Sequence, residues 1–517
     1  MGNNVSFIAA IEVGSHEVFL KIAEILPDGK ISEVESMSRT INLGSNSYLL
    51  GYITGENIGR LIDTLIDFKN IISAYPDIEV IAACTSAVRE ANNSLFLIDQ
   101  VYRQTGFKLL VYSNRLEIAA MLRAIRLKMP EFDQLTEEPT LFLDIGAGST
   151  QLTLFDKGEF AFTQNILLGS LRVRDRLSIL EKHTADFIAL MREYISGDLD
   201  YYRSFVPKKT DYKNFILVGN DLDIWRYLAD IPLIGTAELS VEKFNELFDI
   251  IIHNSSFELM RKFDINQEQA TLLLPVSMVI KEMFEFTGLD RVILPDVILA
   301  DGLIAKKAEQ INLIEKDQRL LNYTLSFAKQ IAKRNHTNLK HLEQVEKLAM
   351  QLFDQFQEQH GLEPRYRFIL QIAAILHNIG KFFTVKQDGE IAYEMIKSSD
   401  LIGLTNQEIE LIALLVKHHT DDFFTLEYEK MFLTSQEQLN FVKLAVLLSM
   451  ANALDTGHKS KIKTITTKVR KRHIRVILES NQDLTLESWS FQKVAEYFQE
   501  IFGDELRLSI VPEKENN

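Results

Sequence analysis

The feature that most constrains the fold of this chain is an internal repeat. An apolar stretch from Val5 to Ala10 leads into Ile11-Glu12-Val13-Gly14-Ser15, and a second apolar stretch runs from Val18 to Ile25. The same order returns 132 residues later, where Asp144-Ile145-Gly146-Ala147-Gly148-Ser149-Thr150 follows one apolar stretch and precedes another. Each copy ends in a short turn, so each predicts a strand, a glycine loop, a strand, a turn and a strand.

A helix and a further strand are expected after the first copy. Thr54 can cap the helix, and a buried strand should run from Val80 to Cys84. The apolar residues of the expected helix recur at helical spacing and should form one buried face: Ile58, Leu61, Ile62, Leu65, Phe68 and Ile72. Two α/β halves of this kind, each with an acidic residue and a glycine loop, should face each other across a cleft.

The pattern changes twice further along the chain. After about residue 312 amphipathic helices follow one another up to Asp455, and alternating β-branched residues return from Lys461. We therefore predict four domains. They are a first α/β domain over 1–130 completed by a helix near 300–312, a second over 131–300, a helical domain over 313–455 and a small basic α/β domain over 456–517.

Charge and cysteine content restrict the function. Lys and Arg number 56 against 72 Asp and Glu, and the net charge of −16 should repel polyanions such as DNA or RNA unless basic residues are concentrated locally. The single Cys84 excludes an internal disulfide and a multi-cysteine metal site. No apolar run approaches the ~20 residues that cross a bilayer. We expect a cytoplasmic protein with no membrane or nucleic-acid partner.

The paired glycine loops suit phosphate chemistry. A glycine has no Cβ, so successive backbone N–H groups can turn toward a phosphoryl oxygen. Asp144 can hold a divalent cation or orient water. A single such loop would also suit an ordinary hairpin turn, but two at matched positions favour a phosphate site. Its expected members are Gly14, Ser15, Gly146, Gly148, Ser149 and Thr150.

Two further polar segments follow expected buried strands, Thr85 to Ala91 and Ser113 to Glu117. Open α/β sheets bind ligands at such strand ends. Arg89 has the planar guanidinium that can clamp a phosphate, and Glu117 can accept a proton from an attacking water. The alternatives are a surface salt bridge for Arg89 and a solvated helix start for Glu117.

Taken together, these segments resemble the exopolyphosphatase and guanosine pentaphosphate phosphohydrolase (Ppx/GppA) family of the actin-like ATPase fold. The order and spacing agree over nearly the whole chain. The segments that carry the resemblance are Ala10 to Ser15, Thr85 to Ala91, Ser113 to Glu117, Asp144 to Thr150, Leu168 to Ser170, Leu376 to Lys381 and Ala451 to Asp455.

The resemblance implies an α/β fold of two actin-like (ribonuclease H-like) domains, followed by an all-α HD-like domain and a small α/β domain. It implies metal-assisted hydrolysis of the terminal phosphate of inorganic polyphosphate, or of the 5′ phosphate of guanosine pentaphosphate. Glu117 would be the catalytic base, and Asp144, with Glu12, would hold Mg²⁺ or Mn²⁺. The family resemblance also implies a homodimer.

The chain departs from the family pattern in its phosphate loops. Glu12 replaces an aspartate, His16 an asparagine, Glu17 a serine and Phe19 a basic residue. In the second loop Gln151 stands where a glutamate is usual, and a later Gly-Gly-Thr loop has become Gly219-Asn220-Asp221. A neutral amide is a poorer Mg²⁺ ligand than a carboxylate. The alternative hypothesis is a catalytically weakened homologue that binds polyphosphate or a guanosine alarmone as a regulator or scaffold.

The helical domain has lost the acids of an HD metal site. His341, His377-Asn378 and Asn452 match the spacing of two histidines and two aspartates that hold a divalent cation, but both aspartates are asparagine. This favours a helical scaffold with relic histidines over an HD phosphohydrolase. His418 and His419 could complete a softer site, although paired histidines at a helix end are more often solvated.

A basic run near the C-terminus suits a polyanion. From Lys459 to Arg475 there are eight Lys or Arg, with His473 and no acid. On a strand, alternate residues share a face, so a track of Lys468, Arg470, Arg472 and Arg475 could bind a chain of phosphates. The alternative is a solvated hairpin that keeps an edge strand from pairing.

Overall fold

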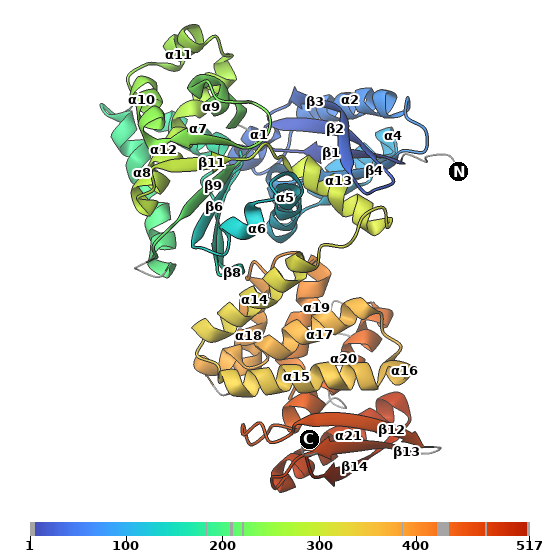
Figure 1. The fold of residues 1–517 in the computed structure, drawn as a ribbon. Coiled ribbons are helices and arrows are strands. Elements are labelled where there is room, and N and C mark those ends of the chain that lie inside the picture. Colours follow the sequence, from blue (N-terminus) through green and yellow to red (C-terminus); the bar gives the residue numbers. More distant parts are fainter. Residues whose placement is uncertain are drawn as a thin grey trace. The chain divides into compact units, whose positions relative to one another are not determined.

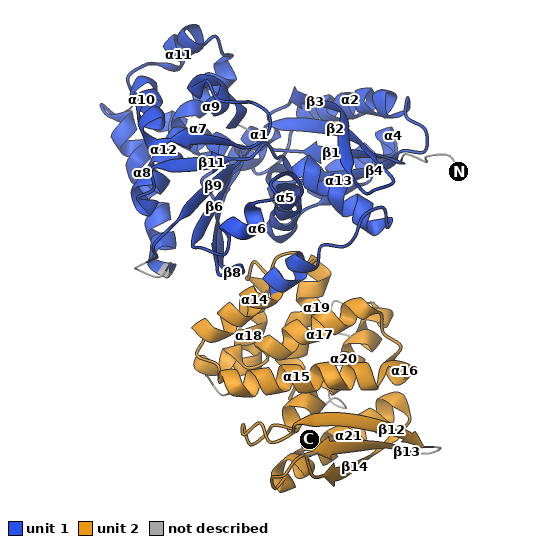
Figure 2. Cartoon of the chain, in the orientation of Figure 1, with its two compact units in different colours: residues 1–324 blue, residues 325–517 orange. Residues whose placement is uncertain are grey.

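The computed structural model describes residues 6–181, 183–206, 210–219, 222–384, 386–420, 434–470 and 473–513. They form two compact units, Met1–Thr324 and Leu325–Asn517 (Figure 2). The first two expected domains lie in the first unit. The second unit contains the expected small α/β domain and all of the expected helical domain beyond Thr324. Helix α14 (Gln318–Arg334) runs across the division.

The first half of unit 1 is built on a five-stranded sheet in the order β3-β2-β1-β4-β5 (Figure 1). The first three strands form an antiparallel meander, and β4 and β5 continue the sheet in parallel with β1. The strands are β1 (Ser6–Val13), β2 (Glu17–Ile25), β3 (Ile31–Thr40), β4 (Glu79–Cys84) and β5 (Leu109–Val111). From Ile8 onward β1 is buried, as a central strand covered on both faces should be.

Helix α2 (Gly55–Ile72) packs on this sheet as the sequence predicts. The Thr54 side chain accepts a hydrogen bond from the Asn57 N–H at the helix start, and the six expected apolar residues are its buried ones. Five other helices belong to this half: α1 (Leu43–Leu50), α3 (Ser86–Glu90), α4 (Ser94–Thr105), α5 (Asn114–Lys128) and α6 (Phe132–Leu135).

The second half repeats the strand order of the first. Its sheet has the order β8-β7-β6-β9-β11-β10, in which β6-β7-β8 is again an antiparallel meander and β9 is parallel to β6. The strands are β6 (Thr140–Ile145), β7 (Thr150–Asp156), β8 (Glu159–Ile166), β9 (Asn214–Val218), β10 (Ala237–Ser240) and β11 (Arg291–Leu294). Glu12 and Asp144 are each the last residue but one of the first strand of their half.

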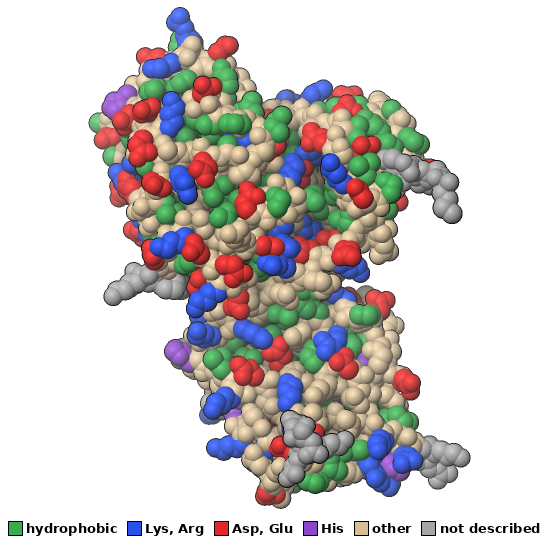
Figure 3. Space-filling model, in the orientation of Figure 1, with side chains coloured by type: hydrophobic (Ala, Val, Ile, Leu, Met, Phe, Trp, Pro, Cys, Tyr) green, Lys and Arg blue, Asp and Glu red, His purple; other side chains and the backbone are tan. Residues whose placement is uncertain are grey.

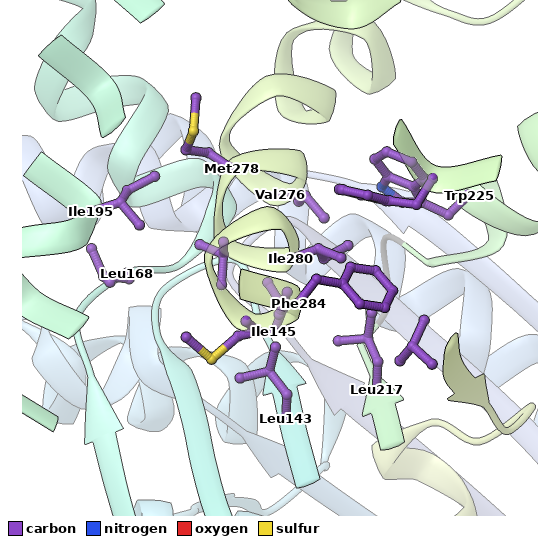
Figure 4. Packing of buried hydrophobic residues seen from close by; sticks show 14 of the residues in the cluster. Leu143, Ile145, Leu168, Ile195, Leu217, Trp225, Val276, Met278, Ile280 and Phe284 are labelled. Atoms are coloured by element: carbon purple, nitrogen blue, oxygen red, sulfur yellow. The ribbon is translucent and has the colours of Figure 1, made fainter. Parts of the chain in front are cut away.

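The core of the second half forms between its sheet and α12. Leu143 and Ile145 of β6 and Leu217 of β9 lie near Ile280 and Phe284 of α12 (Figure 4). The helices of this half are α7 (Ser170–Glu181), α8 (Phe187–Phe205), α9 (Leu222–Ala229), α10 (Val241–Ile252), α11 (Ser256–Phe263) and α12 (Gln267–Thr287).

Helix α13 (Leu299–Gln310) returns from the second half to pack against α5 and β1 of the first. A Cβ at Gly302 would overlap the backbone of Ala120, so glycine allows the two helices to approach closely. This is the position in the chain where the sequence places a helix that completes the first domain.

Unit 2 consists of helices followed by a three-stranded sheet. Strand β13 (His473–Glu479) is central, antiparallel to β12 (Thr464–Arg470) and parallel to β14 (Glu505–Val511). The helices are α15 (Leu339–Gln355), α16 (Gln357–His360), α17 (Pro364–Leu376), α18 (Asp388–Lys397), α19 (Asn406–His418), α20 (Ser435–Ala453) and α21 (Thr485–Phe502), with a 3₁₀ turn at Ile379–Phe382. In the described part of the whole chain, no helix is long and apolar enough to cross a bilayer.

Candidate functional site

A cavity of about 100 Å³ lies within unit 1, where the carboxyl ends of β1 and β6 and the start of α5 meet. Its walls come from both halves, as expected for two facing α/β halves. Most of the residues singled out from the sequence line it: Glu12, Gly14, Ser15, Glu117, Asp144, Gly146, Gly148 and Ser149.

The two glycine loops begin as tight turns. The Gly14 N–H donates to the Glu17 carbonyl at 2.9 Å, and the Gly146 N–H donates to the Ser149 carbonyl at 2.9 Å. These two N–H groups close their loops, so they are not available to a phosphate. In contrast, the N–H groups from Ala147 to Ser149 make no hydrogen bond to another described protein group. Three successive N–H groups of this kind can bind an anion.

Gly148 lies where the two halves touch. A Cβ there would overlap the Tyr48 hydroxyl and the Ser86 hydroxyl. The Ser15, Tyr48 and Ser86 hydroxyls hydrogen-bond to one another at 2.6 to 2.9 Å. The second loop is therefore held against the first half by hydroxyl groups that leave no room for a Cβ at position 148 unless the Tyr48 and Ser86 side chains move.

Arg172 provides a second set of contacts between the two halves. Its guanidinium lies over the Tyr48 ring, 3.8 Å from the centroid, and donates to both carboxylate oxygens of Glu90 at 2.7 Å. Arg172 also donates to the Gly148 carbonyl at 2.5 Å. Sequence reasoning missed Tyr48 and Arg172, because no motif marks either residue and their partners are distant in the chain.

Glu117 stands in the first turn of α5, and its side chain is 26% exposed. Arg89 donates a hydrogen bond to Glu117 Oε1, and further bonds to the Tyr112 carbonyl and the Asn114 side chain, both at 2.5 Å. Burial raises the pKa of the Glu117 carboxyl, while the Arg89 charge acts in the opposite direction.

The structure gives Arg89 partners within the protein. Three acceptors of the protein itself take its guanidinium donors, and Arg89 is not among the described residues that line the cavity. In this arrangement Arg89 orients Glu117, and its role as a phosphate clamp stays a prediction. Thr150 is also placed differently from the expectation, because it is fully buried and its hydroxyl donates to the Leu168 carbonyl at 2.7 Å.

Asp144 faces the same cavity from the end of β6. Burial, and then the nearby charge of Glu117, raise the pKa of the Asp144 carboxyl to about 7. A proton on Asp144 relieves the repulsion between the two carboxylates at neutral pH, and a bound cation would relieve it in the same way.

Gln151 lies directly across the β6–β7 pair from Asp144 and also lines the cavity. Its amide nitrogen donates to the Thr163 hydroxyl, which in turn hydrogen-bonds with the Thr153 hydroxyl at 2.9 Å. The Gln151 amide is thus held in one orientation by the buried hydroxyls of Thr163 and Thr153.

The cavity is strongly acidic. Four carboxylates line it, those of Glu12, Glu17, Glu117 and Asp144, and none of the described lining residues is Lys or Arg. Over the described ranges, no three His, Cys, Asp or Glu side chains are spaced to hold a metal by themselves. Mg²⁺ does not need such a cage, since it is usually held by one or two carboxylates together with water and substrate phosphates. The residues present therefore fit a cation that arrives with a phosphate.

A buried histidine cluster lies in unit 2. His341 and His377 approach with 3.2 Å between their Nε2 atoms, and the His419 ring centroid is 5.5 Å from that of His377. Asp455 contacts His341 Nδ1 at 2.8 Å, while its other oxygen accepts the Ser460 N–H. The cluster thus contains one acid, but Asp455 lies behind His341 with both oxygens in use. The role of an HD-like metal domain stays a prediction.

The basic run from Lys459 forms part of the solvent-facing side of the small sheet. Lys468 of β12, Arg475 of β13 and Arg507 of β14 are direct cross-strand neighbours and so share a face. Lys, Arg and His side chains gather beside the β12–β13 hairpin in Figure 3. Arg470 lies two pairs further along on the same face, opposite His473, and Arg472 lies outside the described residues. Arg507, which contacts Glu505 at 2.8 Å, was not expected from the sequence.

Comparison with known proteins identifies relatives of both units. A curated phosphatase relative, the bifunctional 3-dehydroquinate synthase/phosphatase of Fusobacterium nucleatum, is 22% identical over 304 residues, which are 56% of this chain and 44% of that protein. The guanosine-5′-triphosphate,3′-diphosphate pyrophosphatase of Aliivibrio fischeri is 21% identical over 450 residues, which are 85% of this chain and 86% of that protein.

Solved structures share the fold of about 60% of the chain. A crystal structure of an exopolyphosphatase from Cytophaga hutchinsonii has a TM-score of 0.53 and 21% identity, covering 60% of this chain and 99% of that one. The Ppx/GppA family member of Aquifex aeolicus has a TM-score of 0.50 and 20% identity, with the same coverage. The model of the Ppx/GppA phosphatase family matches residues 22–311, and that of its domain III matches residues 325–493. The chain therefore belongs to the Ppx/GppA phosphatase family.

Proposed function

We propose that this protein is an exopolyphosphatase-type phosphohydrolase. It releases the terminal phosphate of inorganic polyphosphate or of guanosine pentaphosphate. The observation that supports this most directly is one cavity that holds Glu117, Asp144 and the second glycine loop together. The family is one of phosphatases, and its relatives include an exopolyphosphatase and a guanosine-5′-triphosphate,3′-diphosphate pyrophosphatase.

In the proposed reaction the terminal phosphoryl group lies against the N–H groups from Ala147 to Ser149. Ser15 and Ser149 add hydroxyl donors from the two facing loops. A water molecule attacks the terminal phosphorus and gives up a proton to the Glu117 carboxylate. The bond from phosphorus to the bridging oxygen breaks, and its electron pair leaves with the shortened chain. Arg89 orients Glu117 during the attack, and its charge opposes the rise that burial causes in the pKa of that carboxyl.

A divalent cation, Mg²⁺ or Mn²⁺, would be held by Asp144, with Glu12 close by in the same wall. When bound, it would offset the charge of the phosphate oxygens. Because the cavity has four carboxylates and no described Lys or Arg in its walls, the phosphate chain would be repelled without this offset. We therefore propose that the cation is needed for substrate binding as well as for turnover.

The proposal is tested by phosphate release from the purified protein. Long-chain polyphosphate and guanosine pentaphosphate are each supplied with Mg²⁺, with Mn²⁺ and with excess chelator. We expect release with at least one cation and none with chelator. An absence of release under every condition would contradict the proposal.

A weakened homologue that binds polyphosphate or a guanosine alarmone is the second candidate. It is supported by Gln151, whose amide is fixed by Thr163 at a position where the family resemblance implies an acid. Tight, cation-dependent binding of polyphosphate or guanosine pentaphosphate without phosphate release would favour this candidate over the first.

We further propose that the solvent-facing side of the small sheet binds part of a polyphosphate chain. Lys468, Arg475 and Arg507 form a continuous row across three strands, and Arg470 extends it. A flexible polyanion gains affinity from several adjacent cations even when each is exposed, and salt screens that attraction. In a protein of net charge −16, such a row is a local exception.

A further inference from the structure

His16 stands in the first glycine loop, and its ring forms part of the wall of the phosphate cavity. The four carboxylates of this wall would repel a leaving phosphate chain, and no Lys or Arg is found among the described lining residues. His16 is therefore the described wall residue that can carry a positive charge, because an imidazole gains a proton near neutral pH. The family resemblance places an asparagine at this position, so His16 is a residue in which this chain departs from that pattern.

The backbone and the ring of His16 are both held by the segment that follows β3. The His16 carbonyl accepts hydrogen bonds from the Ile41 and Asn42 N–H groups, both at 3.0 Å. The ring Nδ1 lies 2.7 Å from Asn42 Oδ1 and 3.3 Å from Glu268 Oε1 on α12. An ionised carboxylate can only accept a hydrogen bond, so Nδ1 carries a hydrogen and donates it. Nε2 is then the ring nitrogen that can hold or release a second proton.

The charged groups that face His16 favour its protonated form. Glu268 lies beside Nδ1, and Glu17 Oε1 lies 4.0 Å from Nε2. The other charged groups in the described walls of the two cavities that His16 lines are all acids: Glu12, Glu117, Asp144 and Asp223. Negative charges stabilise the imidazolium, as the carboxylate behind the histidine of a Ser-His-Asp triad does. The Nε2 proton can therefore be held until an oxygen of the substrate accepts it.

We propose that His16 is the general acid of the proposed reaction and protonates the leaving phosphate chain. Glu117 takes a proton from the attacking water, and the bond from the terminal phosphorus to the bridging oxygen breaks. The electron pair of that bond stays on the bridging oxygen, which accepts the Nε2 proton of His16. His16 then regains a proton from solvent, and Glu117 returns its proton to solvent. Glu268 is a positioning residue, because it acts through His16. The inference rests on the proposed function and adds a catalytic residue to it.

The test follows phosphate release over a range of pH, with the substrate that gives release in the experiment above. A base and an acid together give a bell-shaped profile of kcat, in which Glu117 sets the acid limb and His16 sets the alkaline limb. We expect His16→Gln to lower kcat by about 10²-fold or more and to remove the alkaline limb, with a smaller change in KM. His253→Gln, at an exposed position at the end of α10, is the matched control and should change neither.

Two further variants separate chemistry from support of the fold. His16→Ala should lose the same limb and regain part of its rate when imidazole is added, which a residue that only supports the fold would not do. Glu268→Gln should move the alkaline limb to lower pH, because the imidazolium loses the carboxylate beside its Nδ1. Glu242→Gln, which removes a carboxylate from the first turn of α10, is the control and should leave the limb in place.

An alkaline limb that stays unchanged in His16→Gln and in Glu268→Gln, with phosphate release intact, would overturn the role of His16 and leave the proposed function standing. A raised KM with an unmoved alkaline limb would also overturn it, since His16 would then only bind the chain. If both His16 variants fail to fold, an unmoved limb in Glu268→Gln would by itself overturn the inference. An absence of release by the unmodified protein would overturn the proposed function and this inference with it.

Discussion

Arg89 donates a hydrogen bond to the Glu117 carboxylate, so the residue expected to clamp a phosphate also holds the expected catalytic base. Burial raises the pKa of Glu117, and the Arg89 charge limits that rise. The limit matters for a base because a protonated carboxyl cannot accept a proton from water. In the proposed reaction the arginine would therefore act through Glu117, as a positioning residue.

Arg89→Gln should move the acid limb of the pH profile to higher pH. The arginine lowers the pKa of Glu117, so its removal raises that pKa and the base is deprotonated only at higher pH. The measurement is kcat/KM against pH for both proteins. Arg103→Gln, which breaks an exposed ion pair with Asp99, is the control. An unmoved acid limb with a raised KM would instead assign Arg89 to the substrate.

Glu117→Gln should lower kcat by ~10² to 10⁴ and leave substrate affinity nearly intact, because it removes proton acceptance but keeps the shape of the side chain. Single-turnover phosphate release and equilibrium binding are measured on the same preparation. A rate equal to that of the unmodified protein would exclude Glu117 as the base.

Gln151→Glu should raise the rate or tighten Mg²⁺ binding. The change restores an anionic group across the strand pair from Asp144, and the Thr163 hydroxyl that now accepts from the amide can donate to a carboxylate. Gln134→Glu, at an exposed position on α6, controls for the added charge. Lower activity of a folded Gln151→Glu variant would show that the site requires the amide.

Asp144→Asn should stabilise the metal-free protein at alkaline pH and not at acid pH. Folding raises the pKa of Asp144 to about 7, so the folded state binds a proton more strongly than the unfolded chain. The folded state therefore loses stability as the pH rises from about 4 to about 7, and asparagine removes that loss. Urea unfolding at about pH 5 and about pH 8 measures the effect.

Excess Mg²⁺ at alkaline pH should stabilise the unmodified protein and not the Asp144→Asn variant. An equal gain in stability in both proteins would argue against Asp144 as a cation ligand.

Much of the fold could be predicted because its signals are local. The six apolar residues of α2 recur at helical spacing, and the loops after β1 and β6 share one order of residues, so both the helix and the duplication are visible in the sequence. Glu117 could be predicted as a site residue because it stands at the start of a helix that follows an apolar strand.

The partners of the site residues could not be predicted in the same way. Arg89 meets Glu117, and Arg172 meets Tyr48, only after strands and helices that are distant in sequence pack together. A local pattern therefore identified Arg89 as a candidate site residue but could not show that Glu117 is one of its partners. The place of Arg507 in the basic row was missed for a related reason. Strand β14 pairs with β13 in parallel only after the intervening helix α21, and this pairing brings Arg507 beside Arg475.

Replacing the four described cations of the small sheet by glutamine should weaken the binding of long polyphosphate and flatten its dependence on salt. The four are Lys468, Arg470, Arg475 and Arg507. A chain of phosphates carries about one negative charge per unit and can contact the whole row, whereas a very short polyphosphate fills only the phosphate cavity and should bind as before.

The control for this change is a variant in which four exposed lysines on helices of the same unit become glutamine, so that the net charge changes equally. They are Lys333, Lys340, Lys347 and Lys493. Affinity for long and short polyphosphate is measured over a range of salt for all three proteins. Equal losses in the two variants would assign the effect to overall charge. A loss confined to the sheet variant, and growing with chain length, would place the polyphosphate on the row formed by β12, β13 and β14, where cations from three strands lie side by side.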